Sequence, residues 1–317
     1  GCAWVPARMS RTALLFAGQG AQVVGMGRDL AAQFPAAREL FDRANAVLGY
    51  DLARLCFEGP EATLVQTEHA QPGIYLVSWV AFELLRVRVP GLAFHATAGL
   101  SLGEFTALAA AGALGFEDGL RVVRARGRFM QEACAATRGG MAAVIGLDEA
   151  ATREVCATAG IELANLNCPG QLVVSGDTEG IARAVELARA RGAKKAIPLP
   201  VAGAYHSRLM ASAQPRLAAE LAGIELRAPQ VPVIANVTAR PHGGPDGIRA
   251  RLVEQVTAPV RWEEGIRGLV AEGFTRFLEV GPGRALSGFM KRIAPGAQAL
   301  NVADAASLEA TVEVLTG

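Results

Sequence analysis

Residues 99–103, Gly-Leu-Ser-Leu-Gly, have the residue types and spacing of a serine nucleophile held in a tight turn. They lie between a short apolar run at residues 94–98 and a helical pattern at residues 104–113. Such a turn exposes the serine hydroxyl at the edge of a sheet, and its glycines avoid collisions with neighbouring backbone. The helix start behind it directs N–H groups at a developing oxyanion. Ser101 is therefore the candidate nucleophile, although a chain with 36 glycines can also contain this pattern as a plain glycine-rich turn.

A second candidate is an arginine on the apolar face of a predicted helix. At about 100° per residue, the polar face carries Arg121, Arg124 and Arg128, and the apolar face carries Arg126 with Val122, Val123, Phe129 and Met130. A buried guanidinium needs an anion or several carbonyl groups, because an unpaired buried charge is strongly unfavourable. Two interpretations of Arg126 stay open: an ion pair with a core carboxylate, or a bidentate clamp for a substrate carboxylate.

A general base for Ser101 must come from four histidines. His69 is expected in a turn, His95 in the strand before residue 99, and His242 in a Pro- and Gly-rich surface loop. His206 follows a loop-like segment just after a predicted small subdomain, where it could reach back to the main domain. His206 is the best-placed base, although a lone histidine can equally be structural.

The composition excludes several classes of protein. With 51% hydrophobic residues, a net charge of +1 and no basic, aromatic-rich run, the chain is predicted to be globular and not to bind nucleic acid. The five cysteines (Cys2, Cys56, Cys134, Cys156 and Cys168) show neither disulfide nor zinc spacing, which favours a reducing cytoplasm. No stretch has the length of a signal peptide or membrane span. Residues 1–9 are interpreted as an N-terminal extension or cloning remnant.

Strand and helix patterns alternate along most of the chain, which predicts a parallel α/β core. The expected strands are residues 14–16, 94–98, 231–236, 277–280 and 299–302, with helices such as 74–86 and 246–256 between them.

The middle of the chain has a different order, strand-helix-strand-strand-helix-strand, which is typical of a ferredoxin-like unit. Its expected elements are residues 141–146, 149–157, 162–167, 171–175, 179–191 and 194–198. We therefore predict a small subdomain at residues 138–199, inserted into a large catalytic subdomain formed by residues 10–137 and 200–317.

Taken together, the motifs resemble those of malonyl-CoA:acyl carrier protein transacylases. The resemblance spans residues 10–303 in the expected order: residues 16–22 (Phe-Ala-Gly-Gln-Gly-Ala-Gln), 99–104, 126–131, 165–170, 203–207, 236–237, 255–262 and 279–283. Each motif is weak alone, but the combination is specific. It implies an α/β-hydrolase-like large domain with a parallel sheet and an inserted ferredoxin-like subdomain.

The resemblance also implies roles for residues. Ser101 would attack the thioester of malonyl-CoA, and His206 would take and return its proton. The backbone N–H groups of Gln19 and Leu102 would hold the oxyanion. The acyl-serine would then react with the phosphopantetheine thiol of acyl carrier protein in a ping-pong cycle.

Further implied residues surround this pair. Arg126 would clamp the malonyl carboxylate, and a carbonyl near Gln255 would orient His206 in place of an aspartate. Asn165 and Asn167 are expected to satisfy backbone groups between the subdomains. The implied partners are a coenzyme A thioester and acyl carrier protein, with no bound cofactor, no metal, no membrane or nucleic acid, and a monomeric state.

Three further residues close to the motifs need separate interpretations. Leu100 stands where many bacterial relatives have histidine, which puts any contact of that ring in doubt. Tyr205, where relatives often have phenylalanine, keeps aromatic bulk that accompanies malonyl substrates in related acyltransferases. Glu104 is interpreted as a favourable charge at a helix N-terminus.

Rival classes use the same residues differently. A serine esterase or thioesterase of the α/β-hydrolase type could use Asp118, Asp148 or Asp177, which lie between Ser101 and His206 in the required order. Its usual oxyanion loop is missing from the sequence, however, and a buried Arg126 has no purpose toward a neutral ester. An inactive carrier-protein-binding module would be expected to lose these residues. Origin from a polyketide synthase acyltransferase domain also stays open.

Overall fold

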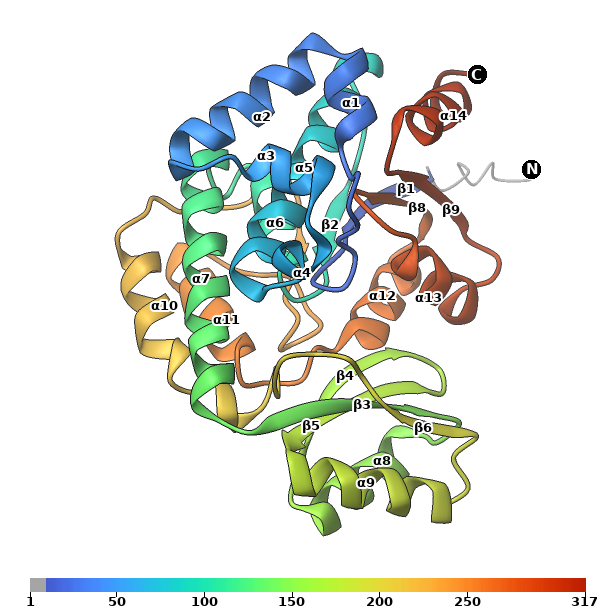
Figure 1. Ribbon diagram of the computed structural model, residues 1–317. Helices are drawn as coiled ribbons and strands as arrows, with labels where there is room; N and C mark the ends of the chain where they lie inside the picture. Colours follow the sequence, from blue (N-terminus) through green and yellow to red (C-terminus); the bar gives the residue numbers. More distant parts are fainter. Residues whose placement is uncertain (1–9) are drawn as a thin grey trace, which may run out of the picture.

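Two sheets and the helices around them form the structure, a computed structural model that describes residues 10–317. The interpretation of residues 1–9 falls outside the described residues. Figure 1 shows a large unit with helices on both faces of its sheet and a small sheet at one end, joined to it by the long helix α7 (Phe116–Ala136).

The large sheet is five-stranded and parallel throughout, in the order β7-β2-β1-β8-β9. Its strands are β1 (Arg11–Phe16), β2 (Ala96–Gly99), β7 (Val233–Ile234), β8 (Phe274–Val280) and β9 (Gln298–Val302). Alternate residues of β1 enter different cores, since Leu14 and Phe16 pack on one face while Ala13 and Leu15 pack on the other. Burial on both faces explains why these strands appear in the sequence as continuous apolar runs.

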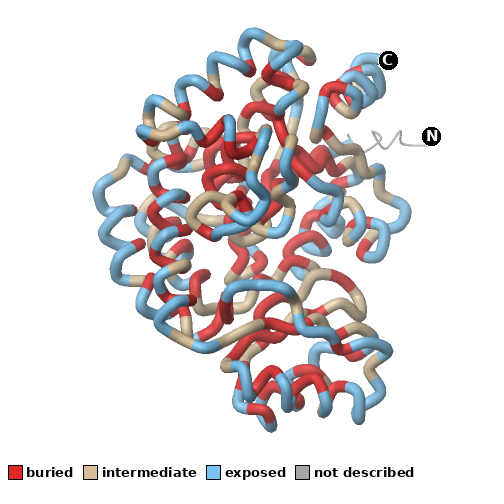
Figure 2. Tube along the Cα trace, in the orientation of Figure 1, coloured by how far each residue is buried: buried red, intermediate tan, exposed pale blue. Residues whose placement is uncertain are grey.

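Helices cover both faces of this sheet (Figures 1 and 2). One face packs against α5 (Thr67–Arg88), α6 (Gly103–Ala110) and α7, and the other against α12 (Trp262–Ala271) and α13 (Ala285–Ile293). The remaining elements of the large unit are α1 (Arg28–Gln33), α2 (Pro35–Leu48), α3 (Leu52–Glu58), α4 (Glu61–Leu64), the 3₁₀ helix η1 (Arg208–Met210), α10 (Ala213–Ala222), α11 (Pro245–Gln255) and α14 (Ala305–Thr316).

The small sheet is antiparallel, in the order β4-β5-β3-β6. It consists of β3 (Gly139–Ile145), β4 (Glu162–Cys168), β5 (Gln171–Asp177) and β6 (Lys195–Pro198), with α8 (Glu149–Ala159) and α9 (Thr178–Ala190) packed on its outer face (Figure 1). This order confirms the predicted ferredoxin-like unit within an α/β fold. The subdomain boundaries at residues 138 and 199 stay a prediction.

Hydrogen bonds join the small sheet to the segment between α11 and α12 of the large unit. Leu166 in β4 donates its N–H to the carbonyl of Val260, and Val260 donates to that of Ala164. The segment that follows α11 is thereby fixed against the small sheet. No helix within residues 10–317 combines the length and apolar character needed to cross a membrane.

The turn after β2 leaves no room for a side chain at either of its glycines, Gly99 and Gly103. A Cβ on Gly99 would lie 1.8 Å from the carbonyl oxygen of Gly103, and a Cβ on Gly103 would lie 2.1 Å from that of Phe16. Because these are backbone atoms, Gly99→Ala should lower the free energy of unfolding by about 1–3 kcal/mol or more, as measured by urea denaturation, and should displace Ser101.

Gly268→Ala is the matched control, because Gly268 lies on the exposed side of α12 with open space where its Cβ would be. In this helix alanine should stabilise the protein by up to about 1 kcal/mol. Equal stability of the Gly99 and Gly268 variants would contradict the steric account.

Candidate active site

The turn between β2 and α6 holds Ser101 in a strained conformation. Ser101 has φ 55°, a left-handed conformation that a residue with a side chain rarely adopts. The turn is fixed to β1, because Leu100 donates its N–H to the carbonyl of Phe16. The strain and the close-packed glycines on either side project the hydroxyl away from the sheet, as in a nucleophile elbow.

His206 approaches this hydroxyl from the segment between β6 and η1. Its Nε2 lies 2.9 Å from Ser101 Oγ, and its Nδ1 lies 2.9 Å from the backbone carbonyl oxygen of Gln255. A carbonyl oxygen can only accept, so Nδ1 carries the proton and the Nε2 lone pair faces the serine hydroxyl. His206 itself has φ 58°, and Ser207 closes its turn by donating to the carbonyl of Ala204.

The environment keeps His206 neutral. Burial, followed by the positive charge of Arg126, lowers the pKa of His206 to about 4, and the hydrogen bond to the Gln255 carbonyl opposes the shift only partly. A neutral imidazole with its lone pair on the nucleophile is the form that a general base needs.

Arg126 is the largest fully buried side chain of the described residues, and it lies beside the nucleophile. Its Nη1 donates to Gln71 Oε1 at 2.7 Å, and its Nη2 donates to Gln255 Oε1 at 2.7 Å and to Ser101 Oγ at 3.2 Å. Burial lowers the pKa of Arg126 to about 10, so the group stays charged at neutral pH. No carboxylate of residues 10–317 forms a salt bridge with it, so the structure shows no direct ion pair for this arginine.

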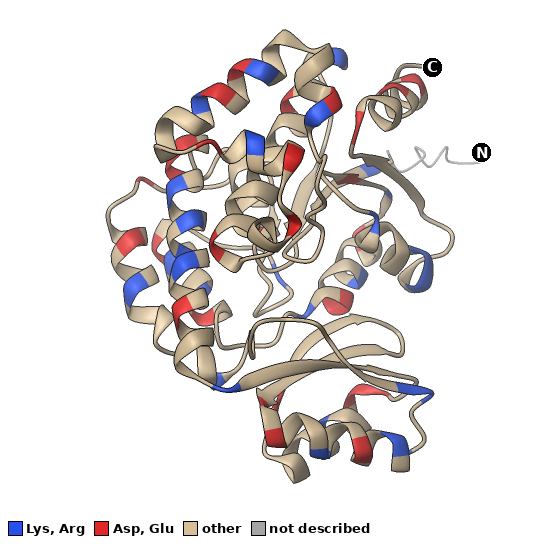
Figure 3. Ribbon diagram, viewed as in Figure 1, with Lys and Arg blue, Asp and Glu red and all other residues tan. Residues whose placement is uncertain are grey.

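Part of this guanidinium is unused. Its Nε is buried and has no hydrogen-bond partner among the described residues. The other arginines of the same helix, Arg121, Arg124 and Arg128, are exposed along its outer face (Figure 3). A buried, charged group with spare donors next to a nucleophile can bind an anion carried by the acyl group.

Gln255, the last residue of α11, connects the two halves of the site. Its backbone carbonyl holds His206, its Oε1 accepts from Arg126, and its Nε2 donates to the carbonyl of Ser101 at 3.0 Å. Asn236 supports the same turn: its Oδ1 accepts from the N–H of Ser101 at 2.7 Å and its Nδ2 donates to the carbonyl of Gly99. The sequence analysis had no role for Asn236, Gln71 or the Gln255 side chain.

The residues expected to form the oxyanion hole lie in two adjacent turns, with Leu102 after β2 and Gln19 after β1. Gly18 is so close to the turn after β2 that a Cβ there would lie 2.2 Å from the carbonyl oxygen of Leu100. The N–H groups of Gln19 and Leu102 have no acceptor within residues 10–317. Their use as oxyanion donors stays a prediction.

Asn165 and Asn167 are not part of this constellation. Both lie in β4, and the buried Oδ1 of Asn167 has no partner among the described residues. Asn165 forms an isolated parallel β-bridge with Val260. Their expected role between the subdomains stays a prediction.

The aspartates of the hydrolase alternative lie elsewhere. Asp148 and Asp177 precede α8 and α9 in the small unit, where Asp148 accepts from the N–H of Ala151. Asp118, in the first turn of α7, contacts Arg121. Because a carbonyl oxygen occupies Nδ1 of the histidine, none of the three completes a triad.

Two other expectations about local structure were wrong. His69 lies within α5, not in a turn, and packs against the ring of Tyr50. His242 was expected on the surface, yet its side chain is fully buried against Glu104. Glu104 lies in the first turn of α6, where its charge was expected, and its side chain is fully buried.

Tyr205 and Leu100 border the site. The Tyr205 hydroxyl lies 2.6 Å from Thr67 Oγ1, which accepts from Gln19 Nε2 at 3.2 Å. Leu100 packs with the core on the α12 side of the sheet and contacts the turn at Gly18. An apolar side chain therefore fills the position where many relatives have histidine.

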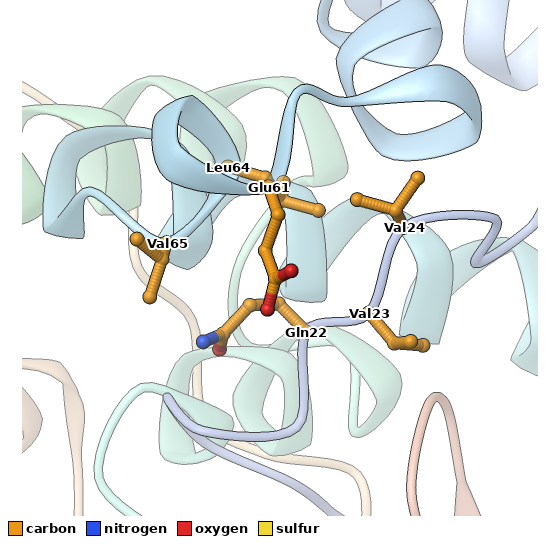
Figure 4. A pocket seen from close by; sticks show the side chains of 6 residues that line it. All are labelled: Gln22, Val23, Val24, Glu61, Leu64 and Val65. Carbon is orange, nitrogen blue, oxygen red and sulfur yellow. The ribbon is translucent and has the colours of Figure 1, made fainter. Parts of the chain in front are cut away.

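No group of three or more histidine, cysteine or acidic side chains in residues 10–317 is arranged to hold a metal ion. A shallow hollow beside α4, drawn in Figure 4, contains none of the site residues; it is lined by Gln22, Val23, Val24, Glu61, Leu64 and Val65.

A strained serine paired with a neutral histidine, in this fold, defines an enzyme that transfers acyl groups through serine. The family described as acyl transferase domain matches residues 13–309. A malonyl CoA-acyl carrier protein transacylase of Bacillus subtilis (strain 168) is 44% identical over 97% of this chain and 98% of its own length.

Solved structures agree with this match. The malonyl CoA-acyl carrier protein transacylase of Coxiella burnetii superimposes with a TM-score of 0.93 at 38% identity, covering 97% of this chain and 98% of its own. A malonyl-transacylase solved with a type II polyketide synthase acyl-carrier protein gives a TM-score of 0.93 at 39% identity, covering 96% of this chain and 100% of its own. The chain belongs to the malonyl CoA-acyl carrier protein transacylase family of acyltransferases.

The lowered pKa of His206 predicts the acid side of the pH profile. Because the folded enzyme takes up this proton only near pH 4, kcat/KM for acylation should stay level between about pH 5 and pH 8. An ordinary histidine would instead cause a fall below about pH 6.5.

The measurement is the initial rate of acylation in buffers of constant ionic strength. Each sample is returned to pH 8 and assayed again, which separates titration from unfolding. A reversible tenfold loss between pH 7 and about pH 5.5 would show that the imidazole titrates normally.

Proposed function

We propose that this enzyme transfers malonyl groups from coenzyme A to the phosphopantetheine thiol of acyl carrier protein through a malonyl-serine intermediate. The observation that carries the proposal is the contact of 3.2 Å between the buried Arg126 guanidinium and Ser101 Oγ. An acyl group attached to that oxygen begins within reach of a positive charge. A carboxylated acyl group satisfies the charge, whereas a neutral one does not.

In the first half-reaction Ser101 Oγ attacks the thioester carbonyl carbon while His206 Nε2 takes the hydroxyl proton. The N–H groups of Gln19 and Leu102 donate hydrogen bonds to the carbonyl oxygen as negative charge forms on it. The tetrahedral intermediate then breaks its carbon–sulfur bond, and His206 gives the proton to the leaving thiolate. The Gln255 carbonyl stabilises the imidazolium that exists between these steps.

In the second half-reaction the carrier-protein thiol replaces coenzyme A. His206 removes the thiol proton, sulfur attacks the malonyl-serine ester, and the proton returns to Ser101 Oγ as the ester bond breaks. The match to a transacylase solved with its carrier protein supports this acceptor. Burial of His206 and Arg126 limits the water available to hydrolyse the ester.

Mass spectrometry of the intact protein tests the proposal. After mixing with malonyl-CoA in the absence of carrier protein, the wild type should gain one malonyl group, and peptide mapping should place it on Ser101. Ser101→Ala should gain none while its circular dichroism spectrum stays that of the wild type. Malonyl labelling of the alanine variant would refute Ser101 as the nucleophile.

The clamp is tested by comparing two acyl donors. Arg126→Ala should lower kcat/KM for malonyl-CoA at least about 30- to 150-fold, since a charge-assisted contact contributes about 2–3 kcal/mol, and should lower acetyl transfer far less. Arg121→Ala, an exposed arginine of the same helix, is the matched control and should change neither rate. Equal losses for both donors in Arg126→Ala would show a structural role instead.

A further inference from the structure

A buried pair of ionisable side chains lies directly behind the active site, and the acyl-transfer steps do not use it. His242 Nε2 lies 2.6 Å from Glu104 Oε2, and both side chains are shielded from solvent. The chain after β7 folds back to bring the histidine there, because Ile234 bridges to Pro241 and the N–H of His242 donates to the carbonyl of Val233.

The other oxygen of Glu104 faces the active site. Glu104 Oε1 accepts from the N–H of Asn236 at 3.0 Å and from Gln255 Nε2 at 3.2 Å. The carboxylate therefore receives three N–H donors in all, which is how a buried charge of this kind is satisfied.

These contacts fix which way the Gln255 amide points. Its Nε2 faces three oxygen atoms, those of Glu104, the Ser101 carbonyl and Asn236 Oδ1, while its Oε1 faces Arg126. A rotation of the amide by 180° would direct its N–H groups at the guanidinium, which has only donors, and its oxygen at three other oxygens. The observed orientation is the only one that satisfies both sides.

Glu104 also acts electrostatically on the Arg126 guanidinium. Burial lowers the pKa of Arg126, and the charge of the buried Glu104 opposes that shift in part; Tyr205 contributes in the same direction as Glu104. His242 Nδ1 is buried and has no partner among the described residues. A neutral imidazole that donates from Nε2 fits this position, because an imidazolium would bury an unpaired N–H.

We propose that Glu104 and His242 form a positioning pair for the substrate clamp. His242 holds the Glu104 carboxylate in place, Glu104 fixes the Gln255 amide, and Gln255 aims the guanidinium at the acyl group on Ser101. The pair thereby determines selectivity for carboxylated acyl donors. This inference rests on the proposed function, since it assigns the residues behind the proposed clamp.

Replacing the histidine donor tests the pair. In His242→Leu the buried carboxylate loses its shortest hydrogen bond and is no longer fixed in place, so it no longer holds the Gln255 amide. We expect kcat/KM for malonyl-CoA to fall about tenfold or more, and that for acetyl-CoA to fall less than about threefold. An equal fall for both donors, or no fall for malonyl-CoA, would overturn the proposal.

Two amide variants separate the hydrogen bond from general packing. The Nε2 of glutamine reaches about as far as the Nε2 of histidine, whereas asparagine is shorter by one methylene. His242→Gln should keep malonyl transfer within about threefold of the wild type, and His242→Asn should resemble His242→Leu. Both amide variants carry the same functional group, so comparing them tests the hydrogen bond to Glu104 even if the leucine variant folds poorly. Equal activities of the two amide variants would contradict the proposal.

A double-mutant cycle shows whether His242 acts through Arg126. In the Arg126→Ala background, His242→Leu should lower malonyl acylation by no more than about twofold, because the group it positions is gone. An undiminished tenfold loss would place its effect elsewhere. The same measurements distinguish failure of the proposed function from failure of the positioning pair. If the wild type takes up no malonyl group, the proposed function is refuted. If the losses of malonyl acylation in Arg126→Ala and His242→Leu add up in the double variant, only the positioning pair is refuted.

Discussion

A guanidinium inside a protein core needs acceptors for its N–H groups and an anion for its charge, and Arg126 has only part of this. Two glutamine side chains and the nucleophile accept from it, yet no carboxylate of the described residues pairs with it directly. The burial that lowers its pKa also makes any carboxylate that reaches it bind strongly. The proposed clamp follows from this charge, because a carboxylate on the acyl group would supply the anion that the described residues do not place in contact with Arg126.

Gln255 extends this constraint to the chemistry. Its side chain holds the guanidinium and its backbone carbonyl holds His206, so one residue at the end of α11 aligns both recognition and proton transfer. A backbone carbonyl is a suitable hydrogen-bond acceptor for His206, because this histidine lies close to the positive charge of Arg126. A buried aspartate there could pair with the Arg126 charge, whereas a neutral carbonyl fixes the tautomer of His206 without pairing with that charge.

Features encoded in neighbouring residues could be predicted from the sequence. The turn around Ser101 follows from two glycines, the burial of Arg126 from helical spacing, and the ferredoxin-like unit from its strand and helix order. The strand before the turn is shorter than expected, since β2 begins at Ala96 and its paired neighbours decide its length.

Features created by distant residues could not be predicted in this way. The Gln255 carbonyl was expected only through the family resemblance. Glu104 meets His242 across 138 positions of sequence, and the Pro-His-Gly-Gly-Pro segment has the composition of an exposed loop. His242 is buried because the chain folds back along β7, and no local sequence pattern predicts that fold-back.

The most direct test of the account is a crystal structure of the malonyl-enzyme, prepared by exposing crystals to malonyl-CoA without carrier protein. The account predicts an ester on Ser101 whose free carboxylate accepts two hydrogen bonds of about 2.8 Å from Arg126, with the Gln255 carbonyl still bonded to His206. A malonyl carboxylate that points to solvent, or that is held by any other cation while Arg126 keeps only its glutamine partners, would contradict it.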